Sequence, residues 1–146
     1  MVNKMIKQFN DSKTFLEIVD KLKDVPDCRL KESTFYTYMI AGLYNEATLT
    51  FASYSKEKMN GCAVLTIGKD IMCELTLFIV FLWLDPHYRK LWRKYMEFIE
   101  DKARELKAVK ISFTTARSAE AIDRRLGKYG YSKVYNVIEK EIKDVI

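Results

Sequence analysis

The chain has 146 residues, of which 49% are hydrophobic and 31% are charged. It is therefore long enough to bury a core and too apolar to be a disordered polypeptide. Its 25 Lys and Arg exceed its 20 Asp and Glu modestly and without clustering, which suits an anionic ligand and argues against a nucleic-acid-binding surface. The longest apolar run, residues 71–84, is too short to span a bilayer, and no leader-like segment opens the sequence. We therefore expect one cytoplasmic domain with no membrane partner.

Ten elements are predicted from hydrophobic periodicity and turn signals. In chain order they are a strand at 4–9, helices at 12–25 and 32–43, strands at 47–54, 62–67 and 71–84, a helix at 87–106, a strand at 109–113, a helix at 118–126 and a strand at 131–142. Asp11 offers N-cap chemistry for the first helix. Asn60-Gly61 and residues 68–70 are typical of turns on either side of the 62–67 strand.

This order predicts an α/β (α+β) fold, with a mixed central sheet of six to seven strands flanked by about four helices. The 71–84 segment is apolar on both faces for much of its length, as expected of a strand in the middle of a covered sheet. The path from it through the 87–106 helix to the strand at 109–113 predicts a crossover between parallel strands.

The three cysteines and the single histidine have no chemical role in this interpretation. Cys28, Cys62 and Cys73 form no CxxC pair, which indicates reduced thiols, and one histidine argues against a zinc site. Cys62 and Cys73 are expected to be buried in strands, and His87 to be an exposed turn residue.

Two segments resemble a known superfamily. Residues 82–90 read LWLDPHYRK, in which a strand ends in a Pro-x-Tyr-Arg turn that opens a helix, and residues 126–134 read LGKYGYSKV, with Gly-Tyr before the last strand. Together with the element order, these segments resemble the GNAT (N-acetyltransferase) superfamily over residues 60–142, and more loosely over the first sixty. The resemblance implies the GNAT acyl-CoA N-acyltransferase fold and acetyl-CoA, or another acyl-CoA, as cofactor.

The resemblance also implies which residues hold this cofactor. Backbone groups of the strand at Leu82 and Leu84 would bond the pantetheine arm, and the N-terminus of the next helix would face the pyrophosphate. The family places glycines in that helix start, whereas the matching positions here, counted from Arg89, are Trp92 and Lys94. Four cationic side chains at this helix start either replace the backbone amide contacts to the pyrophosphate or are simply solvated: Arg89, Lys90, Arg93 and Lys94. The predicted cofactor-binding set is Leu82, Trp83, Leu84, Arg89, Lys90, Leu91, Trp92, Arg93 and Lys94.

Acyl transfer to an amine needs a base and often an acid. Family enzymes commonly use a Glu on a central strand, so Glu74 is the predicted base, its pKa raised by burial within the apolar run. The alternative is that Glu74 lies at the exposed start of the strand and pairs with a Lys. The position of the family's acidic Tyr, four residues before Gly130, holds Leu126. Tyr129 and Tyr131 are candidate replacements, or they are core and edge aromatics.

The predicted function is therefore acyl-CoA-dependent N-acyltransfer by direct attack in a ternary complex, with an unidentified amine, a small molecule or a protein, as acceptor. One alternative is a catalytically inactive GNAT-like protein that binds a protein or nucleic acid through its basic surface, and a weaker one is an unrelated α/β binding module. A homodimer is compatible with the sequence. The missing glycines resemble divergent viral members of the superfamily, which suggests a phage-type protein acting in the host cytoplasm.

Overall fold

The computed structural model describes residues 5–25, 28–88, 90–113, 124, 126–134 and 138–142. The chain forms two compact units, residues 1–116 and 117–146, and each is described by itself. The first unit contains a five-stranded sheet whose strands lie in chain order. They are β1 (Lys7–Gln8), β2 (Thr48–Ser55), β3 (Lys58–Lys69), β4 (Leu75–Leu84) and β5 (Lys110–Phe113). β1 to β4 are antiparallel and β5 is parallel to β4, so the predicted mixed sheet and crossover are confirmed.

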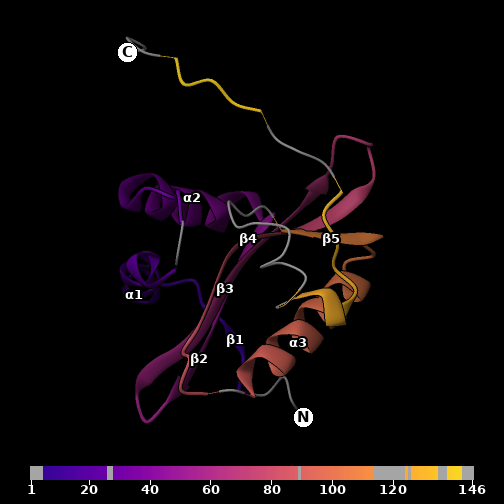
Figure 1. Ribbon diagram of the computed structural model, residues 1–146. Helices are drawn as coiled ribbons and strands as arrows, with labels where there is room; N and C mark the ends of the chain where they lie inside the picture. Colours follow the sequence, from indigo (N-terminus) through magenta and orange to yellow (C-terminus); the bar gives the residue numbers. More distant parts are fainter. Residues whose placement is uncertain are drawn as a thin grey trace. The chain divides into compact units, whose positions relative to one another are not determined.

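Three α-helices cover the two faces of this sheet (Figure 1). α1 (Ser12–Asp20) and α2 (Glu32–Asn45) lie on one face, and α3 (Leu91–Glu105) lies on the other. α1 begins where predicted, because a carboxylate oxygen of Asp11 accepts the Thr14 N–H at 2.9 Å, and a 3-10 turn, η2 (Lys21–Asp24), extends it. Each face of the sheet is thereby shielded from water by an apolar helix surface.

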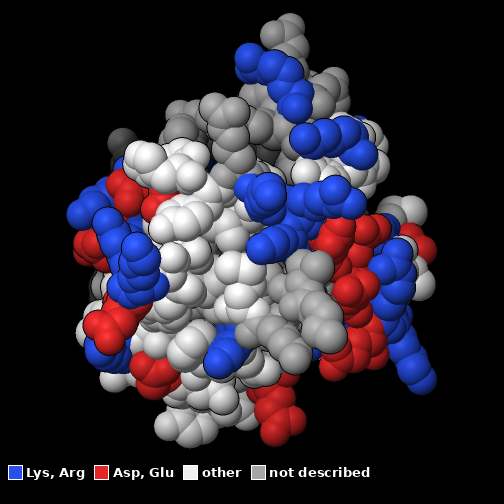
Figure 2. Space-filling model, turned by 90° about the horizontal axis from the view of Figure 1, so that it is seen from below, with Lys and Arg blue, Asp and Glu red and all other residues white. Residues whose placement is uncertain are grey.

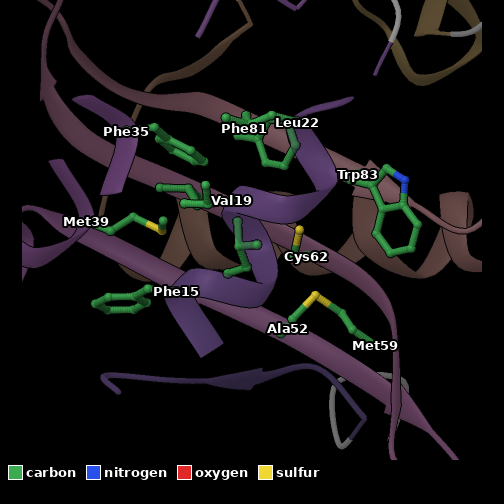
Figure 3. Close-up of a cluster of buried hydrophobic side chains, with 12 residues drawn as sticks. Phe15, Val19, Leu22, Phe35, Met39, Ala52, Met59, Cys62, Phe81 and Trp83 are labelled. Carbon is green, nitrogen blue, oxygen red and sulfur yellow. The ribbon is translucent and has the colours of Figure 1, made fainter. Parts of the chain in front are cut away.

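One hydrophobic core lies between α1, α2 and the sheet (Figure 3). The rings of Phe35 from α2 and Phe81 from β4 pack edge to face, with centroids 5.3 Å apart. On the opposite face, Phe51 of β2 packs in the same way against Phe98 of α3 at 4.8 Å. Aromatic pairs of this geometry contribute about 0.5–1.5 kcal/mol beyond their buried area, so both layers are fixed to the sheet.

The predicted turn at Asn60-Gly61 was wrong. The chain reverses at Lys56 and Glu57, which adopt left-handed φ angles of 52° and 67°, while Asn60 and Gly61 lie inside β3. Two consecutive residues in this region are typical of the type I′ turn that matches strand twist. The Asn60 side chain is buried and accepts a hydrogen bond from Ser53 at 2.5 Å, so tertiary contacts decide the register.

The second predicted turn, at residues 68–70, was wrong by a few residues. Gly68 and Lys69 still belong to β3, and the turn is formed by the residues from Asp70 to Cys73. A carboxylate oxygen of Asp70 accepts the N–H groups of Met72 and Glu74 at 2.9 and 3.0 Å. Because these bonds hold the turn, β4 starts only at Leu75, and Cys73 is exposed, not buried as predicted.

The second unit contains a short 3-10 helix, η3 (Gly127–Tyr129), closed by Gly130 with a left-handed φ of 88°. The predicted strand at 131–142 was wrong for its described residues, 131–134 and 138–142, which form no strand. Its alternating apolar residues Val134, Ile138 and Ile142 are exposed, because no strand in the described part of the chain pairs with it. The predicted helix at 118–126 lies largely outside the described residues.

The expected six to seven strands and four helices are thus five strands and three α-helices within the described ranges. Whether the chain behaves as the predicted single domain stays a prediction. In the same ranges, no helix is both long enough and apolar enough to cross a membrane.

Candidate cofactor site

The strand pairing of β4 changes halfway along its length. The described part of the β4–β5 ladder runs from the pair Thr76 and Lys110 to the pair Ile79 and Phe113, and the residues that follow Phe113 lie outside the described part of the chain. The register between β3 and β4 shifts at the same level, where Leu65 faces Ile79 but Val64 faces Phe81, so that Val80 is the extra residue of a β-bulge. A bulge bends the strand locally, and pairing with β3 continues beyond it to Leu84. From Phe81 onward, no described residue pairs with β4 on its β5 side.

The hydrogen bonds at the end of β4 show which of its residues face that edge. In an antiparallel ladder, successive residues direct their N–H and C=O groups to opposite edges of the strand. The N–H of Asp85 donates to the carbonyl of Asn60 in β3 at 2.8 Å. By alternation, Trp83 also directs its backbone groups toward β3, and Leu82 and Leu84 direct theirs away from it. These are the two residues that the resemblance assigns to the pantetheine arm.

A compact turn joins this edge to α3. The carbonyl of Asp85 accepts the Tyr88 N–H at 3.0 Å, and the carbonyl of Tyr88 accepts the Leu91 N–H at 3.1 Å. The Asp85 carboxylate accepts the backbone N–H of His87 at 2.9 Å and contacts Nδ1 of the same residue at 2.8 Å. These His87 contacts lower the pKa of Asp85. α3 thus begins directly beside the end of β4, with the positive end of its dipole at this junction.

The side chains of the predicted phosphate-binding set differ in their surroundings. Lys90 and Arg93 are exposed, and Arg93 donates to Glu97 one turn further along at 3.0 Å. Trp92 and Lys94, at the positions of the missing glycines, are half-buried, and Nζ of Lys94 lies 3.5 Å from the sulfur of Met5.

Apart from Arg89, the remaining residues of the predicted set are apolar. Leu82, Trp83 and Leu91 are buried, so they contribute to the core. Arg89 lies outside the described residues. The described residues therefore place the outward-directed backbone groups of Leu82 and Leu84, the start of α3 and the exposed side chains of Lys90 and Arg93 at one end of β4.

Glu74 lies at the other end of this strand. Its side chain is 53% exposed and pairs with Lys110 of β5 at 2.9 Å, so the prediction that Glu74 is buried was wrong. The cause is the turn held by Asp70, which also pairs with Lys110 and places Glu74 before β4 begins. At about 3.3 Å per residue, Glu74 is about 30 Å from Leu84. Its role as a base stays a prediction without the burial that suggested it.

The two predicted tyrosines belong to the second unit. Tyr129 ends η3, and Tyr131 follows Gly130, with its N–H donating to the carbonyl of Leu126 at 3.3 Å. Their catalytic roles stay predictions. In the described part of the chain, no group of His, Cys, Asp and Glu could hold a metal ion.

A buried polar cluster beneath the α3 start was not anticipated from the sequence. The hydroxyl of Tyr95 lies 2.8 Å from Oγ of Ser53, which in turn donates to Asn60. Burial raises the pKa of Tyr95, so its hydroxyl stays protonated. The sequence contains two hints of this cluster. Tyr95 carries a hydroxyl on the apolar stripe of α3, and Asn60 precedes Gly61, but an apolar stripe usually indicates core packing and Asn-Gly usually indicates a turn.

An open groove of about 550 Å³ lies elsewhere on the first unit. It is formed by the start of α1 and the β2–β3 hairpin, and its lining includes Phe9, Asp11, Glu17, Tyr54 and Glu57. None of the residues predicted to hold a cofactor lines it. Two of its carboxylates have partners on the chain, since Asp11 caps α1 and Glu17 accepts the Tyr54 hydroxyl at 3.3 Å.

Comparisons with known proteins identify the fold. No protein-family model and no curated protein matches the chain by sequence. An aminoglycoside 6'-N-acetyltransferase from Acinetobacter haemolyticus is structurally similar, with a TM-score of 0.72 and 16% identity over 94% of this chain and 97% of that one. A predicted acetyltransferase from Clostridium acetobutylicum, solved with acetyl-CoA, has a TM-score of 0.68 and 14% identity, over 93% of this chain and 94% of that one. A transcriptional regulator from Bacillus halodurans has a TM-score of 0.74 and 11% identity, over 94% of this chain and 98% of that one.

The chain therefore has the fold of the GNAT acetyltransferases, as its sequence predicted. At these identities the similarity establishes the fold and leaves the activity to the residues of the site. The comparisons give no support to a phage-type origin.

Proposed function

We propose that this protein is an acyl-CoA-dependent N-acyltransferase that uses acetyl-CoA and an amine acceptor. The observation that supports the proposal most is the direction of the backbone groups after the Val80 bulge: Leu82 and Leu84 direct theirs away from β3, directly before the start of α3. This arrangement presents the outward backbone groups of Leu82 and Leu84 beside a helix N-terminus. One elongated ligand with amides at one end and phosphates at the other fits this pair of features.

The amide-bearing arm of such a ligand matches the open edge of β4. The N–H and C=O groups of Leu82 and Leu84 have no strand partner among the described residues, and peptide-like amides can add to such an edge as an extra strand does. The contacts involve the main chain only. The buried side chain of Leu82 therefore does not obstruct them.

The phosphates match the start of α3. Its first N–H groups are directed along the helix axis toward the end of β4, where anions are stabilised. The exposed ammonium of Lys90 adds positive charge. Nζ of Lys94 lies 3.5 Å from the sulfur of Met5 and Trp92 is half-buried, so both side chains pack partly against the protein.

The chemistry expected at this site is a direct transfer. A bound acyl-CoA would supply an activated acyl group. The amine nitrogen of the acceptor bonds to the thioester carbonyl carbon as the carbon–sulfur bond breaks. A base on the protein or a held water takes the amine proton, and the departing thiolate is protonated. Glu74, Tyr129 and Tyr131 stay candidates for these proton transfers, and Glu74→Gln, Tyr129→Phe and Tyr131→Phe test them through kcat.

A thermal melt with acetyl-CoA tests binding. A ligand present at about 100 times its Kd stabilises the folded state by about 2.7 kcal/mol, which for a chain of this size raises Tm by about 5–10 °C. Co-purified coenzyme A, detected by mass spectrometry of the native protein, would be independent support. An unchanged Tm at millimolar acetyl-CoA would refute the proposal.

A pair of substitutions at Leu84 tests the backbone edge itself. Leu84→Pro removes an N–H that is directed away from β3, so the β3–β4 ladder keeps its bonds, as at an edge strand. Leu84→Ala changes the side chain and keeps the N–H. We expect the proline variant to lose most acetyl-CoA binding and the alanine variant to keep it, with circular dichroism confirming that both are folded. Equal binding by the two variants would contradict the assignment.

The second candidate function is a GNAT-like interaction protein without catalysis. The side chains at the two glycine positions, Trp92 and Lys94, favour it, and one structural neighbour is named a transcriptional regulator. Against a nucleic-acid partner, the face in Figure 2 has acidic side chains beside its basic ones, and the basic groups do not form one continuous surface. Absence of a Tm shift with acetyl-CoA, together with retention of a protein or nucleic-acid partner, would favour this candidate.

A further inference from the structure

Three buried polar side chains join α3 to the sheet. Tyr95 of α3, Ser53 of β2 and Asn60 of β3 are nearly inaccessible to solvent. The Tyr95 hydroxyl lies 2.8 Å from Oγ of Ser53, and this Oγ donates to Oδ1 of Asn60 at 2.5 Å. A buried polar group without a partner is costly. The Tyr95 hydroxyl therefore depends on Ser53 as its partner, and the Ser53 hydroxyl depends on Asn60.

The position of the Tyr95 ring is also fixed by a missing side chain. A Cβ on Gly61 would lie 2.8 Å from Cε2 of Tyr95 and 2.9 Å from its hydroxyl oxygen. The ring therefore rests on the bare backbone of β3. The hydroxyl bond and this close contact together restrain the start of α3 against β2 and β3.

The same cluster reaches the end of β4. Asn60, which accepts the Ser53 bond through its side chain, accepts the Asp85 N–H through its carbonyl at 2.8 Å. Asp85 directly follows Leu84. Tyr95 lies four residues, about one helical turn, after the first residue of α3. The cluster therefore links α3, one turn after its start, to the end of β4.

We propose that the Tyr95 hydroxyl is a positioning group that, through Ser53 and Asn60, fixes the start of α3 relative to the backbone edge at Leu82 and Leu84. This inference rests on the proposed function. A ligand that binds both features at once requires a defined spacing between them, because its two ends are linked. A ligand that binds only one feature does not require it. Loss of the hydroxyl should therefore weaken the whole cofactor selectively and leave its fragments unaffected.

Tyr95→Phe tests this, because it removes one oxygen and keeps the ring on Gly61. Dissociation constants for coenzyme A and for pantetheine, which lacks the phosphates, are measured for both proteins by calorimetry or ligand-observed NMR. We expect the Kd of coenzyme A to rise about tenfold, of the order of one lost hydrogen bond, and the Kd of pantetheine to stay unchanged. A purely structural role would change both constants alike, and that result would overturn the inference.

Two further variants make the test independent of one substitution. Ser53→Ala breaks the cluster from β2 and should produce the same selective loss, with little further loss in the double variant because both act on one contact. Thr76→Val is the matched control. It removes a buried hydroxyl, bonded to the Glu74 carbonyl at 2.9 Å, from the opposite end of β4, and should leave coenzyme A binding unchanged.

The outcomes separate the two proposals. If the unaltered protein binds no coenzyme A, the proposed function fails. If it binds coenzyme A and Tyr95→Phe binds it equally well, the acyltransferase proposal stands and the positioning role of Tyr95 is refuted.

Discussion

A methyl group added at Gly61 would lie 2.8 Å from one carbon of the Tyr95 ring and 3.0 Å from another. Real Cβ atoms do not approach so closely, and the ring is fully buried, so α3 or β3 must shift in Gly61→Ala. Overpacking of this kind costs about 1–3 kcal/mol. The reduced freedom of the unfolded chain returns about 0.4–1 kcal/mol. We expect a net loss of about 1–2 kcal/mol.

Gly68→Ala is the matched comparison within the same strand. The nearest atom to its added methyl group is a ring carbon of Phe78 at 3.9 Å, an ordinary contact, so this variant should be neutral or slightly more stable. Urea denaturation followed by tryptophan fluorescence gives both free energies of unfolding. Gly61→Ala should lower Tm by about 2–8 °C. If the two variants unfold within experimental error of each other, Tyr95 does not constrain the spacing between α3 and β3.

Three further predictions concern stability and reactivity. Lys110→Met should destabilise the fold at pH 7, because Lys110 lowers the pKa of Asp70. The stabilisation from this ion pair is present above the unfolded-state pKa of Asp, about 3.9, and is lost as pH falls through the lowered pKa of the folded state. Denaturation curves of the wild-type and variant proteins should therefore converge toward pH 2. Asp11→Ala removes the N-cap bond of α1 and should cost about 0.5–2 kcal/mol in chemical denaturation, whereas a change below 0.3 kcal/mol would show that the cap is dispensable. Burial raises the pKa of Cys62 to about 12, so its thiol should not react while the protein is folded. After treatment with iodoacetamide, peptide mass spectrometry should find the exposed Cys73 alkylated in the native protein and Cys62 alkylated only after unfolding. Alkylation of Cys62 in the native protein would contradict its burial.

The sequence predicted α1 and α3 well because their signals are local. Asp11 caps the helix that follows it, and the apolar stripe of α3 includes Tyr95 and Ile99, both of which are buried. The parallel crossover from β4 to β5 followed from chain order and from the length of the connection. These features depend on neighbours within a few turns, so no distant contact was needed to predict them.

The turns and the start of β4 depend on distant contacts. Asn60-Gly61 has the composition of a hairpin turn, but Asn60 bonds Ser53 and Gly61 accommodates a tyrosine more than thirty residues later. Ile71 was predicted to begin the apolar strand at 71–84, but its side chain is 76% exposed. The preceding Asp70 is held by Lys110, a residue forty positions away that no local pattern reveals.

The site was predicted only in part, for a related reason. Leu82 and Leu84 were identified through a resemblance, because the groups concerned are main-chain atoms with no signature in side-chain composition. The Val80 bulge, where the register between β3 and β4 shifts, has no distinguishing residue type either. Glu74 was misjudged because an acidic residue beside an apolar run looks buried until the strand boundary is known.

The bulge at Val80 makes the spacing of the following residues more important than their identity. Every group offered by the edge of β4 belongs to the peptide backbone, so conservative exchanges at Leu82 or Leu84 would leave it intact. Deleting one residue between the bulge and Asp85 would instead reverse the alternation, turn those amides toward β3 and bring Trp83 to the edge. For the backbone groups of this edge, an insertion or deletion of an odd number of residues is therefore more damaging than an apolar exchange that preserves the packing of Leu82 and Trp83 in the core.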